Sequence, residues 1–208
     1  TTGDSNTVVG TFALDANTTA DNNTAVGYAA LTANTTGTRN TAVGSGSADA
    51  ITTGSYNTAV GYLSLSSATR SALLNNTTGA SNVAVGVNSL DACTTGASNC
   101  GIGINAGGGI TTGNHNIGIG NNTFVESVVL TTGGQNIIIG NFSRTDAVDS
   151  TYAIGLGYNI SATGGYTTFG NAGADIRAAH GNVTWATVSD ERYKKDIVDS
   201  TAGLSFIN

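Results

Sequence analysis

The sequence predicts an all-β protein, a parallel β-solenoid of about nine 17-residue coils, on three observations. The pattern Asn-x-small-Val/Ile-Gly recurs with a base period of 17 residues, and a Thr-Thr-Gly segment closes most copies. The residues that follow each Asn alternate between larger and small side chains, which is the period of a β-strand. Seventeen residues are also too few for the helix pairs of ankyrin or tetratricopeptide repeats.

The copies can be placed along the chain by their first residue. Eight copies keep the Asn, and a ninth, at Ala153, has lost it; the eight begin at Asn6, Asn23, Asn40, Asn57, Asn82, Asn99, Asn116 and Asn136. The copy at Asn57 is eight residues longer than the base period and the copy at Asn116 is three residues longer. Both insertions precede the Thr-Thr-Gly, so we expect both to protrude at one corner of the solenoid.

Each coil is expected to hold two short strands and two turns. In the first strand, Asn23–Tyr28 being typical, the larger side chains fill a core, while Ala25 and Gly27 leave a smooth second face. Leu31 begins the return strand. We expect the Asn to adopt a left-handed turn and stack from coil to coil, and the Gly of Thr-Thr-Gly to supply a positive φ at the opposite turn. Because one coil cannot bury a core alone, the Ala/Gly face is expected to pack against other copies of the chain.

Composition excludes several classes of protein. The 208 residues include 30 glycines and no proline, and only 10% of them are charged, which is unlike an ordinary soluble enzyme domain. A net charge of −6 disfavours nucleic acid as a partner. No apolar run approaches the ~18 residues of a membrane span, so we expect no membrane insertion. The chain begins with neither a signal peptide nor an initiator methionine, so we expect a fragment of a longer protein.

The repeats resemble the head repeats of trimeric autotransporter adhesins and the related repeats of phage tail fibres. The resemblance rests on Asn-Thr-Ala-Val-Gly-Tyr-x-x-Leu with Thr-Thr-Gly spacers, and it covers roughly residues 6–157. It implies a trimeric, left-handed parallel β-roll, so the expected partners are two further copies of the chain. We therefore expect a solenoid domain over residues 1–157, followed by a β-rich neck over 158–188.

Residues 189–208 resemble the opening of the intramolecular chaperone domain of phage tail fibres and endosialidase-type tailspikes. The resemblance rests on Ser-Asp-Glu-Arg-Tyr-Lys from Ser189 to Lys194 and on the closing Gly-Leu-Ser-Phe-Ile-Asn. It implies a short helical segment, trimerisation, and release by self-cleavage before Asp190, with Ser189 as nucleophile and Lys194 as general base. Taken alone, Ser189 could equally be a helix cap and Lys194 a solvated charge. The family continues well beyond the position of Asn208, and cleavage would need that remainder.

No other set of residues indicates an active site, and we expect no cofactor and no metal. Cys93 and Cys100 are either free thiols or a disulfide across the coil. Asp15, Asp49 and Asp91 share one repeat position. A calcium ladder along them is an alternative to simple surface carboxylates, although they skip coils and lack a dense oxygen cluster.

The expected function is host attachment by a virion, as an extracellular receptor-binding part of a phage-type tail fibre. The resemblance makes a cell-surface glycan the expected receptor. Loops on a rigid scaffold carry recognition, so the candidate binding loops are Ser66–Asn76, with Arg70, and Asn122–Leu130, with Phe124 and Glu126. The alternatives are a bacterial surface adhesin, an ice-binding solenoid and a glycan depolymerase. We expect no enzymatic activity beyond self-cleavage.

Overall fold

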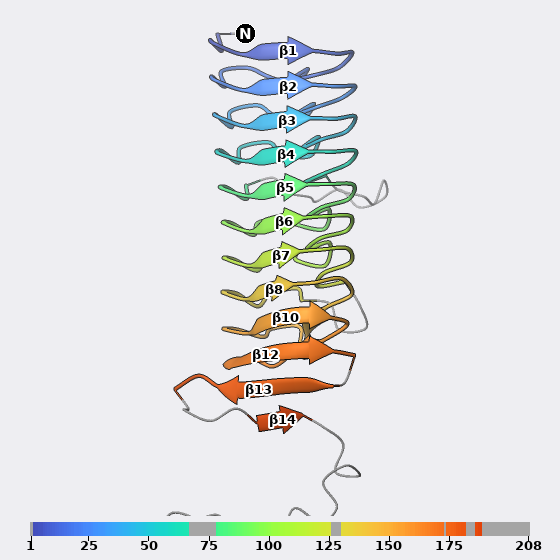
Figure 1. Ribbon diagram of the computed structural model, residues 1–208. Helices are drawn as coiled ribbons and strands as arrows, with labels where there is room; N and C mark the ends of the chain where they lie inside the picture. Colours follow the sequence, from blue (N-terminus) through green and yellow to red (C-terminus); the bar gives the residue numbers. More distant parts are fainter. Residues whose placement is uncertain (1, 67–77, 126–129, 173, 182–185, 189–208) are drawn as a thin grey trace, which may run out of the picture.

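The computed structural model describes residues 2–66, 78–125, 130–172, 174–181 and 186–188. Within these ranges the chain is all-β and contains no helix. It forms a parallel β-solenoid of about nine turns, which confirms the fold class predicted from the 17-residue period (Figure 1). The expected helical segment of residues 189–208 lies outside the described residues, as do residues 67–77 of the longer insertion and 126–129 of the shorter one.

Each coil contributes one short strand, directly after its Asn. The strands of the repeats are β1 (Thr7–Val9), β2 (Thr24–Val26), β3 (Thr41–Val43), β4 (Thr58–Val60), β5 (Val83–Val85), β6 (Cys100–Ile102), β7 (Ile117–Ile119), β8 (Ile137–Ile139) and β10 (Ile154–Tyr158). Equivalent residues pair in parallel register from coil to coil. The longer coils keep that register, since Thr58 pairs with Val83 and Ile117 pairs with Ile137.

Beyond the repeats the stack continues for one more strand and then reverses. β12 (Tyr166–Asn171) adds to β10 in parallel. β13 (Asp175–Ala179) then pairs antiparallel with β12, and β14 (Ala186–Val188) pairs antiparallel with β13. A second, two-stranded sheet joins β9 (Arg144–Thr145) to β11 (Ser161–Ala162). Strands therefore occupy the segment 158–188 that was expected to be β-rich.

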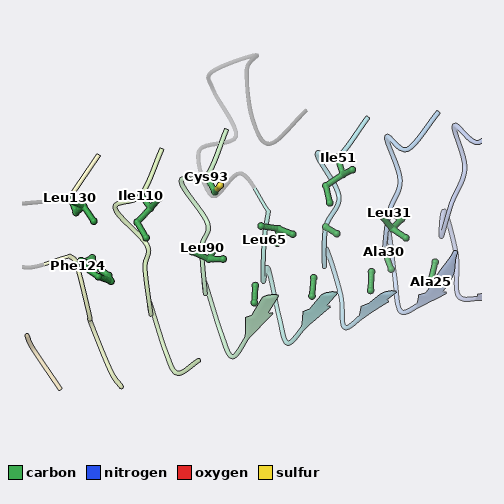
Figure 2. Packing of buried hydrophobic residues seen from close by; sticks show 14 of the residues in the cluster. Ala25, Ala30, Leu31, Ile51, Leu65, Leu90, Cys93, Ile110, Phe124 and Leu130 are labelled. Atoms are coloured by element: carbon green, nitrogen blue, oxygen red, sulfur yellow. The ribbon is translucent and has the colours of Figure 1, made fainter. Parts of the chain in front are cut away.

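The interior of the solenoid is a narrow column with the middle residue of each strand on one side. Ala25, Ala42, Ala59 and Ala84 fill this position and are fully buried. Large side chains from the return segment reach toward them and follow one another along the inside of the rod, among them Leu31, Leu65, Leu90, Ile110 and Phe124 (Figure 2). A Cβ on Gly101, in the same strand position, would lie 2.6 Å from the carbonyl oxygen of Ala106. The return segment of the same chain thus presses directly on the small face of the strand.

The two faces of the strand are therefore the reverse of those expected. The small residues point into the solenoid, and the larger residues on either side of them point outward. The prediction that the Ala/Gly face packs against other copies is wrong, because the chain's own return segment covers that face. The backbone that approaches Gly101 closely belongs to its own coil, and the backbone that approaches Gly27 belongs to the next coil of the same chain.

The return segment is not a strand, which corrects a second expectation. Leu14, Leu31, Leu65 and Leu90 have φ values of 49° to 52°. A left-handed residue turns the backbone and interrupts an extended strand. The segment still stacks on its neighbours through backbone hydrogen bonds, such as the one that Leu31 N–H donates to the carbonyl of Ser47 at 3.0 Å. These leucines are held in a left-handed conformation that aims their side chains into the core.

The Asn ladder stacks from coil to coil as predicted. Asn23 donates its side-chain Nδ2 to the carbonyl of Gly37 at 2.9 Å, and its Oδ1 accepts the backbone N–H of Asn40 at 2.9 Å. Neither Asn is left-handed, however, and neither is Gly37. Gly37 is required for a different reason, because a Cβ there would overlap the carbonyl oxygen of Gly54 on the next coil. The positive φ falls instead on the residue before each Asn and on the Gly that ends each strand.

Candidate functional site

The outward side of the sheet carries an apolar stripe along the repeats. We call the outward-facing first and third residues of strands β1 to β8 and β10 the outward stripe. Six of its large apolar side chains are exposed by 36% to 57%: Val9, Val43, Val60, Val83, Ile102 and Ile139. Thr7 is also exposed, and the remaining members of the stripe are half-buried. Soluble monomers rarely expose continuous apolar patches larger than a few hundred Å².

The outward stripe becomes more apolar toward its C-terminal end. The first residue of each strand is Thr in β1 to β4 and then changes to Val83, Cys100, Ile117, Ile137 and Ile154. The third residue is Val in β1 to β5 and Ile in β6 to β8. The second half of the stripe is therefore its more apolar half by residue type.

A second surface runs along one corner of the solenoid. We call the residues that directly precede each Asn, or Ala153, the corner column. Its nine members all have φ between 57° and 62° and are all exposed: Ser5, Asn22, Arg39, Tyr56, Ser81, Ser98, His115, Gln135 and Tyr152. Every member has a hydrogen-bonding side chain. Aligning the copies on their Asn would have revealed this from the sequence, although the sequence analysis did not single it out.

Two members of the corner column contact each other. Arg39 donates from Nη1 to the hydroxyl oxygen of Tyr56 at 3.0 Å, and its guanidinium carbon lies 5.4 Å from the centre of the Tyr56 ring. Backbone hydrogen bonds attach each residue to the preceding coil: Arg39 N–H donates to the carbonyl of Asp21, and Tyr56 N–H donates to the carbonyl of Thr38. Tyr56 is nevertheless 57% exposed.

Of the three residues predicted in candidate binding loops, the structure describes one. Phe124 is fully buried and belongs to the core cluster. It occupies the return-segment position of Leu31 and Leu90 with a φ of 60°, so it fills the interior and does not face a receptor. Arg70 and Glu126 lie outside the described residues, as do Ser189 and Lys194 of the predicted self-cleavage site.

The two cysteines are free thiols, which removes the disulfide alternative. Cys93 is buried in the core, and burial raises the pKa of its thiol to about 12. Cys100 is half-buried and begins strand β6, so it lies in the outward stripe. Burial also raises the pKa of Cys100. Neither thiol has the low pKa that a reactive cysteine needs.

Two of the three aspartates at the shared repeat position are partly buried. Burial raises the pKa of Asp49 and of Asp91 to about 6 in each case, against a smaller opposing effect of backbone hydrogen bonds. Oδ1 of Asp49 has no hydrogen-bond partner. Asp15 is exposed. Within the described residues no group of three or more His, Cys, Asp or Glu side chains could hold a metal ion.

Comparison of the chain with protein-family models, with curated proteins and with solved structures gives no match. In the part of the chain that the structure describes, no helix has the length and apolar character to cross a membrane. The fold and its two surfaces define the class as a β-solenoid repeat protein with an unpaired apolar stripe.

Proposed function

We propose that this chain is the shaft and receptor-binding part of a trimeric attachment fibre on a phage-type virion, exposed outside the host cell. The observation that carries the proposal is the outward stripe, an apolar face on a straight stack of parallel strands. Exposed apolar faces of this kind are rare on soluble monomers and mark interaction surfaces. The resemblance of the repeats to trimeric adhesin heads and tail-fibre repeats supports three copies as the cover and a left-handed roll.

The proposed subunit interface uses the outward stripe and not the Ala/Gly face. Side-chain hydrophobicity increases along the stripe, from Thr24 to Ile137, which favours the C-terminal half as the stronger contact between subunits. The proposed chaperone segment, residues 189–208, would follow this half after the strands of residues 158–188. We propose that association starts at this end and continues toward β1.

Self-processing is the single covalent step in the proposal. Lys194 would take the proton of the Ser189 hydroxyl, and the Ser189 oxygen would attack the carbonyl carbon of Ser189 to form an ester. The bond to the Asp190 nitrogen would break, with Lys194 returning the proton to the leaving amine, and water would then hydrolyse the ester and restore the hydroxyl. In a precursor that includes the rest of the chaperone domain, we expect two fragments on a denaturing gel for the wild type and one intact band for Ser189→Ala. An uncut wild-type precursor would remove this step and leave the fibre proposal in place.

The fibre proposal itself is tested by mass and by attachment. Sedimentation equilibrium should give three times the 20.6 kDa of one chain. A fluorescently labelled protein should also bind intact cells of at least one strain in a panel of bacteria, and unlabelled protein should compete for the same sites. A monomer at micromolar concentration, or an absence of saturable binding to every strain, would contradict the proposal.

A further inference from the structure

We propose that the corner column around Arg39 and Tyr56 is a binding site for an acidic glycan, an inference that rests on the proposed receptor-binding function. Arg39 and Tyr56 stand on successive coils and contact each other. Asn22 precedes them and Ser81 follows them in the same column. The site therefore combines a cation, an aromatic ring and short polar side chains on four consecutive rungs of a rigid scaffold.

The backbone conformation of the column is the same in every coil and presents its side chains outward. At the end of each strand of the repeats, where φ is 128° to 149°, every coil carries glycine. In the corner column, φ is 57° to 62°, a region where glycine is the least strained residue, and no coil carries glycine. The leucines of the return segment accept similar φ values because their side chains fill the core. The corner column gains no such burial, since all nine residues are exposed.

The composition of the column matches known recognition surfaces. Antibody binding loops are enriched in Tyr, Ser and Asn, with Arg at the strongest contacts. Binding hot spots elsewhere are enriched in Tyr and Arg. The segment Asn22, Arg39, Tyr56, Ser81 and Ser98 consists of these residue types alone. On a stack with fixed register their positions are set before a ligand arrives, which reduces the entropy lost on binding.

The chemistry of the pair selects an anionic sugar polymer. The Tyr56 ring offers an apolar surface for the C–H face of a sugar, and Ser81 on the next rung is too short to cover that ring. Arg39 forms no ion pair with a carboxylate in the described residues. Asp21 on the neighbouring rung, whose carbonyl accepts the Arg39 N–H, uses its Oδ1 to accept the backbone N–H of Asp4. A guanidinium without an acidic partner can bind the carboxylate of a sugar acid through paired hydrogen bonds.

The test is binding of the full chain to an array of immobilised acidic and neutral glycans. Arg39→Ser and Tyr56→Ser are suitable variants, because Ser already occupies the same column position at Ser5, Ser81 and Ser98. Gln135→Ser is the matched control in the same column. We expect wild type and Gln135→Ser to bind acidic glycans alike, and Arg39→Ser and Tyr56→Ser to bind at least tenfold more weakly. Arg39→Lys should recover part of the loss, and binding should weaken as salt rises.

The outcomes separate this inference from the function on which it rests. If the wild type binds glycans and both serine variants bind equally well, the assignment of the site is wrong and the fibre proposal stands. Preference for neutral glycans would overturn the choice of ligand. If the wild type binds no glycan, both this inference and the glycan receptor of the proposed function fail. A change in the mass of the assembly in Arg39→Ser, measured by sedimentation, would show a subunit contact and also overturn the site.

Discussion

The side-chain Oδ1 of Asn99 accepts the backbone N–H of Asn116, the equivalent residue one coil later, at 3.0 Å. The same side chain donates from Nδ2 to the carbonyl of Gly113 at 2.8 Å. One buried amide therefore pairs a donor and an acceptor of the main chain that have no other partner at the corner. In each coil that keeps this Asn, the side-chain amide satisfies main-chain groups at the corner.

Replacement of a ladder residue should destabilise the stack. Asn99→Ala leaves the N–H of Asn116 and the carbonyl of Gly113 buried without partners, and each such group costs about 1–3 kcal/mol. We expect the free energy of unfolding, measured by urea denaturation, to fall by at least about 2 kcal/mol. The exposed Asn22→Ser should change it by less than about 0.5 kcal/mol. Equal effects of the two substitutions would show that the ladder does not stabilise the stack.

The glycine at the end of each strand should tolerate no side chain. Gly103 has a φ of 131°, and a Cβ there would overlap the carbonyl oxygen of Gly120. Gly103→Ala should therefore cost about 3 kcal/mol or more. Gly165→Ala is the control, because Gly165 also has a positive φ, 75°, but its Cβ would meet nothing within 4 Å, and we expect about 1–2 kcal/mol. Thermal melting followed by circular dichroism compares the two, and a Gly103→Ala protein as stable as Gly165→Ala would contradict the packing described.

Stability should fall as pH rises through the range of the buried carboxylates. The pKa of Asp49 and of Asp91 is about 6 in the folded chain and 3.8 without burial. Between these values the folded state binds more protons than the unfolded state. The contribution of the two carboxyls to stability is therefore complete below pH 3.8 and is lost as the pH rises through about 6. We expect the melting temperature to fall by at most a few degrees, because solvent reaches both side chains.

Asn substitutions isolate this effect from the other charges of the chain. Asp49→Asn and Asp91→Asn cannot ionise, so the double variant should have a flatter dependence of melting temperature on pH than the wild type between pH 4 and 7. A double variant with the same slope as the wild type would show that these two carboxylates do not cause the dependence.

A charge placed in the outward stripe should break the proposed trimer. Ile102 is 39% exposed in the single chain, and Ile102→Glu would bury a carboxylate between copies. We expect sedimentation to show monomers for this variant and trimers for Thr95→Glu, which places the same charge on an exposed residue outside the stripe. A trimer that survives Ile102→Glu would exclude the stripe as the interface.

Cys100 gives a second check of the same interface. It lies in the outward stripe, whereas Cys93 is buried inside the coil. At alkaline pH, which offsets the raised pKa of this thiol, a short bis-maleimide should therefore link two copies through Cys100 and should fail to do so in Cys100→Ser. Cross-linking that persists in Cys100→Ser would place the contact elsewhere.

The sequence predicts the repeat far better than it predicts which face of the strand is inside. The period of 17 residues and the Asn at its start determine the stacking, since each coil repeats the same hydrogen bonds. Alternation shows that Ala25 and Val26 lie on opposite faces but not which face is buried. The usual rule, that larger side chains fill a core, fails here because Leu31 of the return segment already occupies the interior.

The left-handed conformation of the corner column could not be predicted from the local preferences of its residues. Arg39 and Tyr56 are not residues that favour a left-handed conformation, so their φ values follow from the stacking and not from their own preferences. Phe124 shows the same limit in reverse. Its place in a longer coil suggested an exposed loop. Its separation along the sequence from the preceding Asn116 is nevertheless the same as that of the core leucines from their own Asn.

The pairing of Thr58 with Val83 across a coil that is eight residues longer than its neighbours has an evolutionary consequence. Because the strand register is kept across insertions of eight and of three residues before the Thr-Thr-Gly, segments can be inserted there without altering the pairing of the rungs above and below. Whole coils can likewise be duplicated or lost by unequal recombination between near-identical repeats. The length of such a solenoid and the loops that it carries can then diversify independently.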